Sequence, residues 1–200
     1  MSVGLTGSIA TGKSEVAKLF LAAGIPVFDS DAEVHGLYAE KTTRDLLGKE
    51  FPDVFVDGEI DRQRLGQRVL ASPKNLRKLE SLIHPLVRKR REQFIARWQK
   101  QGSPFVVLDI PLLFETGQEK ELDYVIVVSA GEDVQRKRAM ARPGMTGQKL
   151  AGILARQMPD VEKRRRADFV IDNSGSLEHL RTQVNALISK LAELARNHKP

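Results

Sequence analysis

The stretch Gly7-Ser8-Ile9-Ala10-Thr11-Gly12-Lys13-Ser14 matches the phosphate-loop pattern G-x-x-x-x-G-K-[ST]. It follows directly on the short extended run 2–6 and precedes residues with helical apolar spacing. The two glycines let the backbone turn tightly and point successive N–H groups at phosphate oxygens. In such a loop the lysine reaches the β- and γ-phosphates, and the final serine ligates the Mg²⁺ that a nucleotide carries. The stretch therefore predicts a site for a nucleoside triphosphate.

Apolar extended runs alternate with helical patterns along the rest of the chain. Besides Val3–Thr6, the runs are Ile25–Phe28, Phe105–Asp109, Tyr124–Val128 and Phe169–Ile171. This alternation predicts an α/β fold with a five-stranded parallel sheet covered on both faces. Ligands of such sheets bind at the carboxyl ends of the strands, where the phosphate loop also lies.

With 200 residues, the chain is long enough for one sizeable core, so we expect a single domain over residues 1–200. Residues 32–103 are too long for a simple crossover and are predicted to be helical throughout, as an insertion that binds a substrate. Pro85 is expected to end one helix of this insertion and begin another. Residues 131–166 are rich in arginine, are divided at Pro143-Gly144 and Pro159, and have the composition of a lid. A last amphipathic helix is expected from Ser176.

The composition excludes several classes of protein. The chain has no cysteine, which rules out disulfides and thiolate catalysis, and its four histidines are scattered, which disfavours a dedicated metal cage. We expect any metal to arrive as Mg²⁺ with the nucleotide. No signal peptide and no apolar run long enough for a membrane span is found, so a cytoplasmic enzyme is expected.

The net charge of +6 comes from 32 basic and 26 acidic residues and is concentrated in short runs, 88–91, 136–138 and 163–166. By itself each run is typical of a solvated helix face. No base-stacking aromatic strand accompanies them, so nucleic acid is not an expected partner. Beside a phosphate loop, some of these arginines are better interpreted as surrounding a multiply phosphorylated substrate.

Two acidic positions follow expected strands. In Asp29-Ser30-Asp31, at least one carboxylate is expected to face the transferred phosphate, where it would accept or orient the proton of an alcohol. The alternative explanation is that one of the two only caps the next helix. We assign Asp31 to the base, and Ser30 or Asp29 to structure and an indirect metal contact. Asp109 ends its strand where a carboxylate could hold Mg²⁺ through water, although a simple strand-end turn explains it as well.

Four basic side chains are further candidates. Arg138 and Arg142 are four residues apart and are expected on one helix face, where both could close over transferring phosphates. His84 and Arg88 lie in the insertion. Taken alone, Arg138 and Arg142 are better explained by surface solvation, and His84 before Pro85 is better explained as a helix-boundary residue.

Taken together, these segments resemble the dephospho-CoA kinase family over almost the whole chain. Besides the phosphate loop, the matching segments are Val27-Phe28-Asp29-Ser30-Asp31, Leu82-Ile83-His84-Pro85 with Arg88, Leu108 to Glu115 (LDIPLLFE), Gln135 with Arg138 and Arg142, Ile153 to Gln157, and Ala167 to Gly175. The D-x-D, H-P and P-L-L-F-E elements distinguish this family from other phosphate-loop kinases. The family pattern has glycine where this chain has Ser8 and Ala10. We expect function to survive, with a stiffer loop or an altered nucleotide affinity.

The resemblance implies a three-layer fold like that of nucleoside monophosphate kinases, with a helical acceptor-binding insertion and a helical lid. It implies ATP and dephospho-CoA as partners, without an obligate protein partner, and phosphorylation of the ribose 3′-hydroxyl. Asp31 would be the base, and Lys13, Arg138 and Arg142 would also be catalytic. Arg138 and Asn173 would bind ATP together with residues 7–14. The residues implied in acceptor binding are Thr6, Asp31, His84, Arg88, Leu112, Leu113 and Phe114.

Three alternatives are weighed against this interpretation. Another phosphate-loop kinase, acting on a nucleoside monophosphate or a small alcohol, would share the fold and differ only in acceptor residues. A GTP-dependent switch normally carries an [NT]-K-x-D segment, which this sequence lacks. A nucleic-acid-binding module is supported by the positive charge alone.

Overall fold

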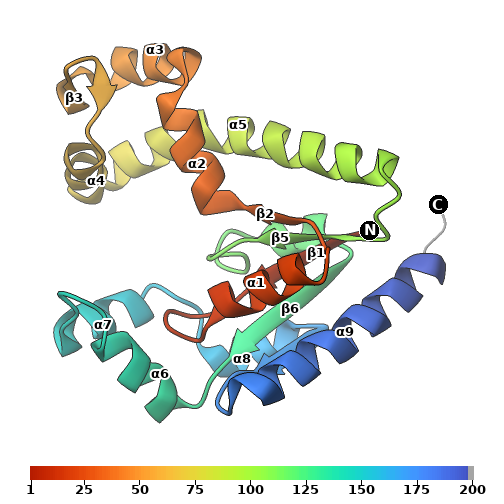
Figure 1. The fold of residues 1–200 in the computed structure, drawn as a ribbon. Helices are drawn as coiled ribbons and strands as arrows, with labels where there is room; N and C mark the ends of the chain where they lie inside the picture. The colour runs from red at the N-terminus through yellow and green to blue at the C-terminus, as the bar shows by residue number, and fades with distance from the viewer. Residues whose placement is uncertain (198–200) are drawn as a thin grey trace. The chain divides into compact units, whose positions relative to one another are not determined.

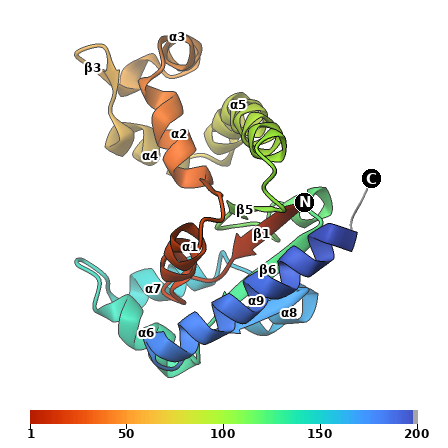
Figure 2. The ribbon, with the colours of Figure 1, turned by 45° about the vertical axis from the view of Figure 1, so that its right-hand side comes forward.

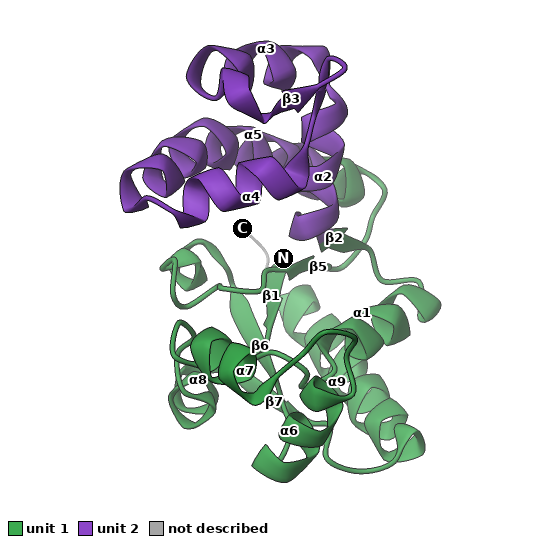
Figure 3. Ribbon diagram, turned by 90° about the vertical axis from the view of Figure 1, so that its left-hand side faces the viewer, with its two compact units in different colours: residues 1–28, 97–200 green, residues 29–96 purple. Residues whose placement is uncertain are grey.

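The computed structural model describes residues 1–197. The chain divides into two compact units, residues 1–28 with 97–200 and residues 29–96, which Figure 3 shows in green and purple. The second unit overlaps the predicted insertion at 32–103. Its role in substrate binding, and that of residues 131–166 as a lid, stay predictions.

The first unit is built on a five-stranded sheet with the strand order β2-β5-β1-β6-β7 (Figure 1). The strands are β1 (Ser2–Thr6), β2 (Val27–Asp29), β5 (Val106–Asp109), β6 (Tyr124–Ser129) and β7 (Phe169–Asp172). β1 pairs in parallel with both β5 and β6, and β6 pairs in parallel with β7. The predicted sheet is confirmed, and each strand lies within two residues of its predicted position.

Helices α1 (Lys13–Ala22) and α9 (Leu177–Asn197) cover one face of this sheet (Figure 2). Val16 and Phe20 of α1 and Leu180 and Val184 of α9 pack with Val3, Leu5 and the apolar side chains of β5, β6 and β7. α1 ends as predicted, since Gly24 takes a φ of +76° and its N–H donates to the carbonyl of Leu21. This packing anchors α1, and with it the lysine and serine of the phosphate loop, on the central strand.

The other face is covered by α8 (Asp160–Arg166), which contacts β6 (Figure 3). The segment after β5, which includes the short helix η2 (Gln118–Glu121), approaches β1 on this side. A Cβ placed on Gly4 of β1 would lie only 2.5 Å from Leu122 and 2.6 Å from Leu113. Gly4 thus allows this segment to approach the centre of the sheet. Helices α6 (Glu132–Met140) and α7 (Gly147–Leu154) follow β6, and the predicted breaks at 143–144 and 159 are confirmed.

The second unit has a small core of its own. Its elements are α2 (Ser30–Ala39), α3 (Lys41–Glu50), η1 (Pro52–Val54), β3 (Phe55–Val56), β4 (Glu59–Ile60), α4 (Arg62–Leu70) and α5 (Pro73–Lys100), which runs on into the first unit. Leu47, Phe51, Val54, Leu65 and Ile83 are buried together in it.

Two expectations for this unit are wrong. The insertion is not helical throughout, because β3 and β4 form a hairpin in which Asp57 and Gly58 both have positive φ, 50° and 81°. Pro85 does not divide α5, which is continuous over 28 residues. Proline has a φ compatible with the helix, and the flanking Leu79, Leu82, Ile83 and Val87 all pack against the core of the unit. That packing holds the two halves in one helix. Among residues 1–197, no helix is long and apolar enough to cross a membrane.

Candidate active site

The phosphate loop joins β1 to α1 and contains a tight turn. The backbone N–H of Thr11 donates to the carbonyl of Ser8, as does its hydroxyl, at 3.3 and 2.9 Å. Gly12 has a φ of +93°, and Ala10 has a φ of +62°, a left-handed conformation that favours glycine. Ala10 therefore holds a glycine-like backbone at a position where the family pattern has glycine.

Asn173, directly after β7, braces the loop from the side. Its side-chain amide donates to the carbonyl of Thr11 at 2.8 Å, and its backbone carbonyl accepts a hydrogen bond from Arg138 Nη1 at 2.8 Å. Asn173 is only 7% exposed. A Cβ on Gly12 would lie 1.9 Å from Asn173 Nδ2 and 3.7 Å from Arg138 Nη1, so both side chains lie against the loop. Asn173 and Arg138 are thereby brought to the predicted nucleotide site.

Lys13 and Asp109 form an ion pair at the carboxyl ends of β1 and β5. Both side chains are largely buried, and Asp109 is the last residue of β5, as predicted. Ser14, which follows Lys13 in the sequence, lies in the first turn of α1 and is exposed. The loop lysine, a strand-end carboxylate and a hydroxyl thus lie together where a phosphate chain is expected.

Ile9 is held by two glutamines to which the sequence interpretation gave no role. Its N–H donates to Gln157 Oε1 at 3.0 Å, and its carbonyl accepts a bond from Gln135 Nε2 at 2.9 Å. The glutamines belong to the connection between α7 and α8 and to α6. Both glutamines lie in segments that resemble the family, and this is the only signal for them in the sequence. No local pattern identifies residues that contact Ile9 from more than a hundred positions away.

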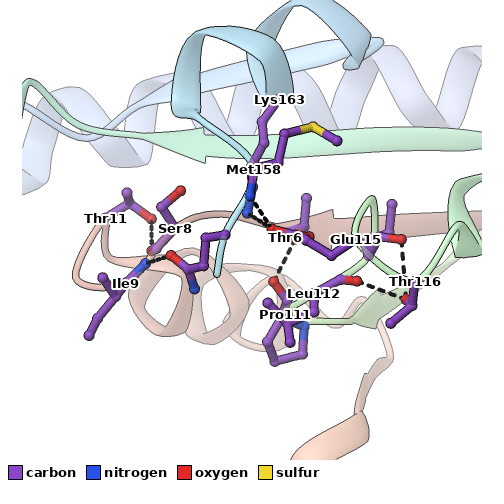
Figure 4. Close-up of polar contacts among 12 residues, drawn as sticks. Thr6, Ser8, Ile9, Thr11, Pro111, Leu112, Glu115, Thr116, Met158 and Lys163 are labelled. Atoms are coloured by element: carbon purple, nitrogen blue, oxygen red, sulfur yellow. Dashed lines mark hydrogen bonds and ion pairs between the residues drawn. The ribbon is translucent and has the colours of Figure 1, made fainter. Parts of the chain in front are cut away.

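The predicted acceptor residues of the first unit lie at the end of β1, directly before the loop, and in the segment that follows β5; Figure 4 labels Thr6 and Leu112 among them. Thr6 is fully buried and its hydroxyl donates to the carbonyl of Pro111 at 3.2 Å. Leu113 and Phe114 are buried, whereas Leu112 is 42% exposed. Leu112 is therefore the member of this group that offers substantial apolar surface.

Of the two candidate carboxylates after β2, Asp29 is the helix cap. Its Oδ1 accepts the N–H of Ala32 at 3.0 Å, which satisfies one of the free amides at the start of α2. Asp31 lies in the first turn of α2 and is exposed. The predicted structural role of Asp29 is supported, because Asp29 caps α2. The role of Asp31 as the base stays a prediction.

His84 and Arg88 are one turn apart on α5. Together with Glu80, Ser81, Pro85, Lys89 and Glu92 they line a shallow cavity of about 380 Å³. Their side chains thus share one surface of the second unit, which is compatible with the predicted binding of a phosphorylated acceptor.

Two expectations about basic residues are wrong. Arg142 does not share a helix face with Arg138, because α6 ends at Met140 and Arg142 lies in the exposed turn that follows. The helix stops there because Pro143 disfavours the helical conformation of the residue before it. Lys163 does not belong to a solvated face, since it is fully buried and pairs with Glu115 at 2.9 Å between Nζ and Oε1. Only its neighbours Arg164 to Arg166 are exposed.

The turn that carries Asn173 is held by its neighbours. Asp172 Oδ1 accepts bonds from the hydroxyl and the N–H of Ser174 at 2.6 and 2.9 Å, and the Ser174 hydroxyl oxygen accepts the N–H of Gly131. The hydroxyl bond is the main reason that the pKa of Asp172 lies below its ordinary value. Asp172 and Ser174 also line a cavity of about 610 Å³ that reaches Ser8.

This geometry predicts a pH-dependent effect of Ser174→Ala on stability. A carboxylate whose pKa is lowered by folding stabilises the protein above its unfolded pKa of about 3.9, and this contribution disappears as the pH falls through the folded pKa. We expect Ser174→Ala to lower the free energy of unfolding by less than about 1 kcal/mol at neutral pH, because Asp172 is exposed.

The loss should shrink as the pH is lowered from about 7 to about 3, which urea unfolding at each pH would measure. Ser103→Ala is the matched control, because the Ser103 hydroxyl donates to a backbone carbonyl, that of Phe105. Its effect should not change with pH. A loss for Ser174→Ala that stays constant over this range would contradict the prediction.

Comparison with known proteins decides the family. The family model described as dephospho-CoA kinase matches residues 1–179. The chain belongs to the dephospho-CoA kinase family. A dephospho-CoA kinase from Mesorhizobium japonicum is 53% identical over 189 residues, which cover 94% of this chain and 95% of the relative.

Solved structures agree with this membership. A crystal structure of a Thermus thermophilus protein superposes with a TM-score of 0.84 at 37% identity, and covers 96% of this chain and 97% of that one. A dephospho-CoA kinase from Campylobacter jejuni has a TM-score of 0.74 at 26% identity, with the same coverage. The predicted family and the phosphate-loop kinase fold are thereby confirmed.

Proposed function

We propose that this chain transfers the γ-phosphoryl group of ATP to the ribose 3′-hydroxyl of dephospho-CoA, giving coenzyme A and ADP. The observation that carries the proposal is the match to the dephospho-CoA kinase family model over residues 1–179. It is supported by a phosphate loop whose lysine already lies against an anionic group, the carboxylate of Asp109.

The phosphate chain of ATP would bind at the amino-terminal end of α1. Free N–H groups and the helix dipole make this end favourable for anions. Lys13 would exchange its contact with Asp109 for one with the β- and γ-phosphates. Arg138, whose guanidinium lies beside Gly12, would add positive charge where the transferring group becomes more anionic. Arg142, from its exposed turn, is proposed to join Arg138 on the ATP.

The donor set at the strand ends fits Mg²⁺, which prefers oxygen ligands and keeps several waters. The hydroxyl of Ser14 would bind the ion directly, and Asp109 would hold it through water. When bound with ATP, the ion would neutralise charge on the phosphate oxygens. Asn173 would contribute to nucleotide binding chiefly by holding the carbonyl of Thr11, and we also propose it as a contact for the adenine.

Asp31 is proposed as the base that accepts the proton of the ribose hydroxyl. A carboxylate in this role orients the attacking oxygen and takes its proton as the new P–O bond forms. His84 and Arg88 would bind phosphates or ribose of dephospho-CoA from α5. Leu112 would contact the acceptor. Thr6, Leu113 and Phe114 would hold the segment that contains Leu112 in place.

The direct test is to incubate the purified protein with MgATP and dephospho-CoA, in parallel with adenosine, AMP and shikimate. ADP release and the mass of each acceptor are followed together. We expect a mass gain of one phosphoryl group on dephospho-CoA alone. Phosphorylation of another acceptor, or ADP release that no acceptor stimulates, would overturn the proposal.

A second prediction concerns Lys13. Lys13→Met should weaken ATP binding and lower turnover, each on the order of a hundredfold, because a fixed positive charge on the transferring phosphates is lost. Calorimetric titration with ATP and steady-state kinetics would measure the two effects.

Lys18→Met on the same helix is the control, since Lys18 is exposed and pairs with Glu15 at 2.6 Å on the surface of the helix. It should leave both quantities within about twofold, as is usual for surface ion pairs. If Lys13→Met bound ATP as tightly as the unmodified chain, the proposed exchange of Asp109 for phosphate would be wrong.

A further inference from the structure

Glu115 connects the segment after β5 with the connection between α7 and α8. Its Oε1 accepts the N–H of Met158 at 2.8 Å and lies 2.9 Å from Nζ of Lys163 (Figure 4). Lys163 extends from α8 toward Glu115 and is fully buried. One carboxylate oxygen therefore holds both the backbone before α8 and a cation on that helix.

This ion pair is a poor means of stabilising the fold. Charges lose their hydration when they are buried, and well-packed apolar side chains of similar volume often serve at least as well. Neither Glu115 Oε2 nor Lys163 Nζ meets the geometry of a hydrogen bond with any described residue. A buried ion pair that costs desolvation is better explained by the position that it fixes than by a gain in stability.

The residue before Met158 contacts the phosphate loop. Gln157 Oε1 accepts the N–H of Ile9 at 3.0 Å, in the turn where Ala10 adopts its left-handed conformation. Gln157 and Met158 are consecutive, so a shift of the Met158 peptide also shifts Gln157. The short stretch 157–158 thus holds Ile9 on one side and Glu115 on the other.

Glu115 directly follows the segment that includes Leu112. Thr6 bonds the start of this segment, at Pro111, to the end of β1, and Glu115 bonds its other end to Met158. The phosphate loop leaves from the same end of β1. A closed path of contacts therefore runs from Thr6 through the 111–115 segment and Met158 to Gln157 and back to Ile9.

We propose that Glu115 is a positioning residue that sets the conformation of the phosphate loop through Met158 and Gln157. The 111–115 segment is thereby coupled to the nucleotide site. The inference rests on the proposed function, because ATP is the ligand whose affinity reports the loop conformation. It adds to that function a coupling between the acceptor segment and ATP affinity.

A double-mutant cycle on ATP binding tests this role with acceptor absent. Glu115→Met keeps the length of the side chain and removes the acceptor for the N–H of Met158, and Gln157→Met keeps its length and removes the acceptor for the N–H of Ile9. We expect each to weaken ATP binding roughly fivefold to tenfold, and the double variant to be no weaker than the weaker single variant, because both act on one contact path. Thr182→Val is the control. It removes the hydroxyl bond to the carbonyl of Glu178 on α9, which lies outside the path, and should leave ATP affinity unchanged.

A second variant separates positioning from stability. Glu115→Met combined with Lys163→Met replaces the ion pair by apolar side chains and should fold with a melting temperature near that of the unmodified chain. We expect it to bind ATP as weakly as Glu115→Met alone does. Unchanged ATP affinity in this variant, or effects of Glu115→Met and Gln157→Met that multiply in the double variant, would overturn the proposal.

The outcome is independent of the acceptor assay. If the unmodified chain failed to phosphorylate dephospho-CoA while the cycle on ATP showed coupling, the proposed acceptor would fall and the role of Glu115 would be supported. If dephospho-CoA were phosphorylated and the cycle showed no coupling, the role of Glu115 would be rejected and the proposed function retained.

Discussion

Asp31→Asn is expected to lower kcat by about 10²- to 10⁴-fold, the range that general base catalysis contributes, and to leave the ATP dissociation constant within about twofold. Asparagine keeps the size of the side chain but cannot accept the proton of the acceptor hydroxyl. Asp31 lies outside the phosphate loop, on α2, so ATP binding should not depend on it. Steady-state kinetics with dephospho-CoA and calorimetry with ATP would measure the two quantities.

Asp29→Asn provides the matched control two residues away. Asparagine caps helices about as well as aspartate, so α2 should keep its first turn and only the charge is removed. We expect a much smaller loss of turnover than for Asp31→Asn. If turnover instead survived in Asp31→Asn and fell in Asp29→Asn, the base would be Asp29.

Gly12→Ala should have the largest effect on the nucleotide site. The new methyl group would lie 1.9 Å from Asn173 Nδ2, in a backbone conformation with φ of +93°. The left-handed backbone costs about 1–2 kcal/mol for alanine, and displacing Asn173 breaks its bond to Thr11 at a further cost of about 1 kcal/mol. We expect a total loss of about 2–3 kcal/mol and a melting temperature roughly 5–10 °C lower.

ATP binding should be lost in the same variant, because the loop amides no longer converge on the phosphates. Gly152→Ala in α7 is the control. Among the described residues, no atom other than those of the adjoining residues and the backbone of the same helix lies within 4 Å of its new methyl group. Alanine also favours a helix by up to about 1 kcal/mol over glycine. Thermal unfolding with and without ATP distinguishes the two variants. A Gly12→Ala chain that melts and binds ATP normally would mean that Asn173 does not brace the loop as described.

Local patterns predicted the frame of the molecule well. The five strands, α1 with its end at Gly24, the breaks at 143–144 and 159, and the last helix all depend on apolar periodicity or on glycine and proline over a few residues. The hairpin of β3 and β4 was missed although Asp57-Gly58 is a hairpin signal, because the strands beside it have only two residues each. The break at Pro85 was predicted wrongly because packing on both sides of the proline outweighs its local preference.

The candidate site was predictable to a different degree in its different parts. The loop directly follows β1, and Asp29 and Asp109 are the last residues of β2 and β5. Because the ends of parallel strands meet at one edge of a sheet, the placement of these residues needs no distant information. Arg142 was misplaced because the end of α6 depends on the turn at Pro143. The burial of Lys163 could not be predicted, because Lys163 belongs to a run of basic residues and its partner Glu115 lies 48 positions earlier.

The sequence by itself determined that this protein has a phosphate loop between a strand and a helix, and the order of the segments that mark its family. These features follow from residue types at short spacing. Tertiary structure alone decided which polar groups hold the loop: Gln135 and Gln157 on Ile9, Asn173 on Thr11, and Glu115 between Met158 and Lys163. Buried polar groups form hydrogen bonds with the partners that the packed sheet and helices bring within reach. Spacing along the chain does not indicate which partners these are.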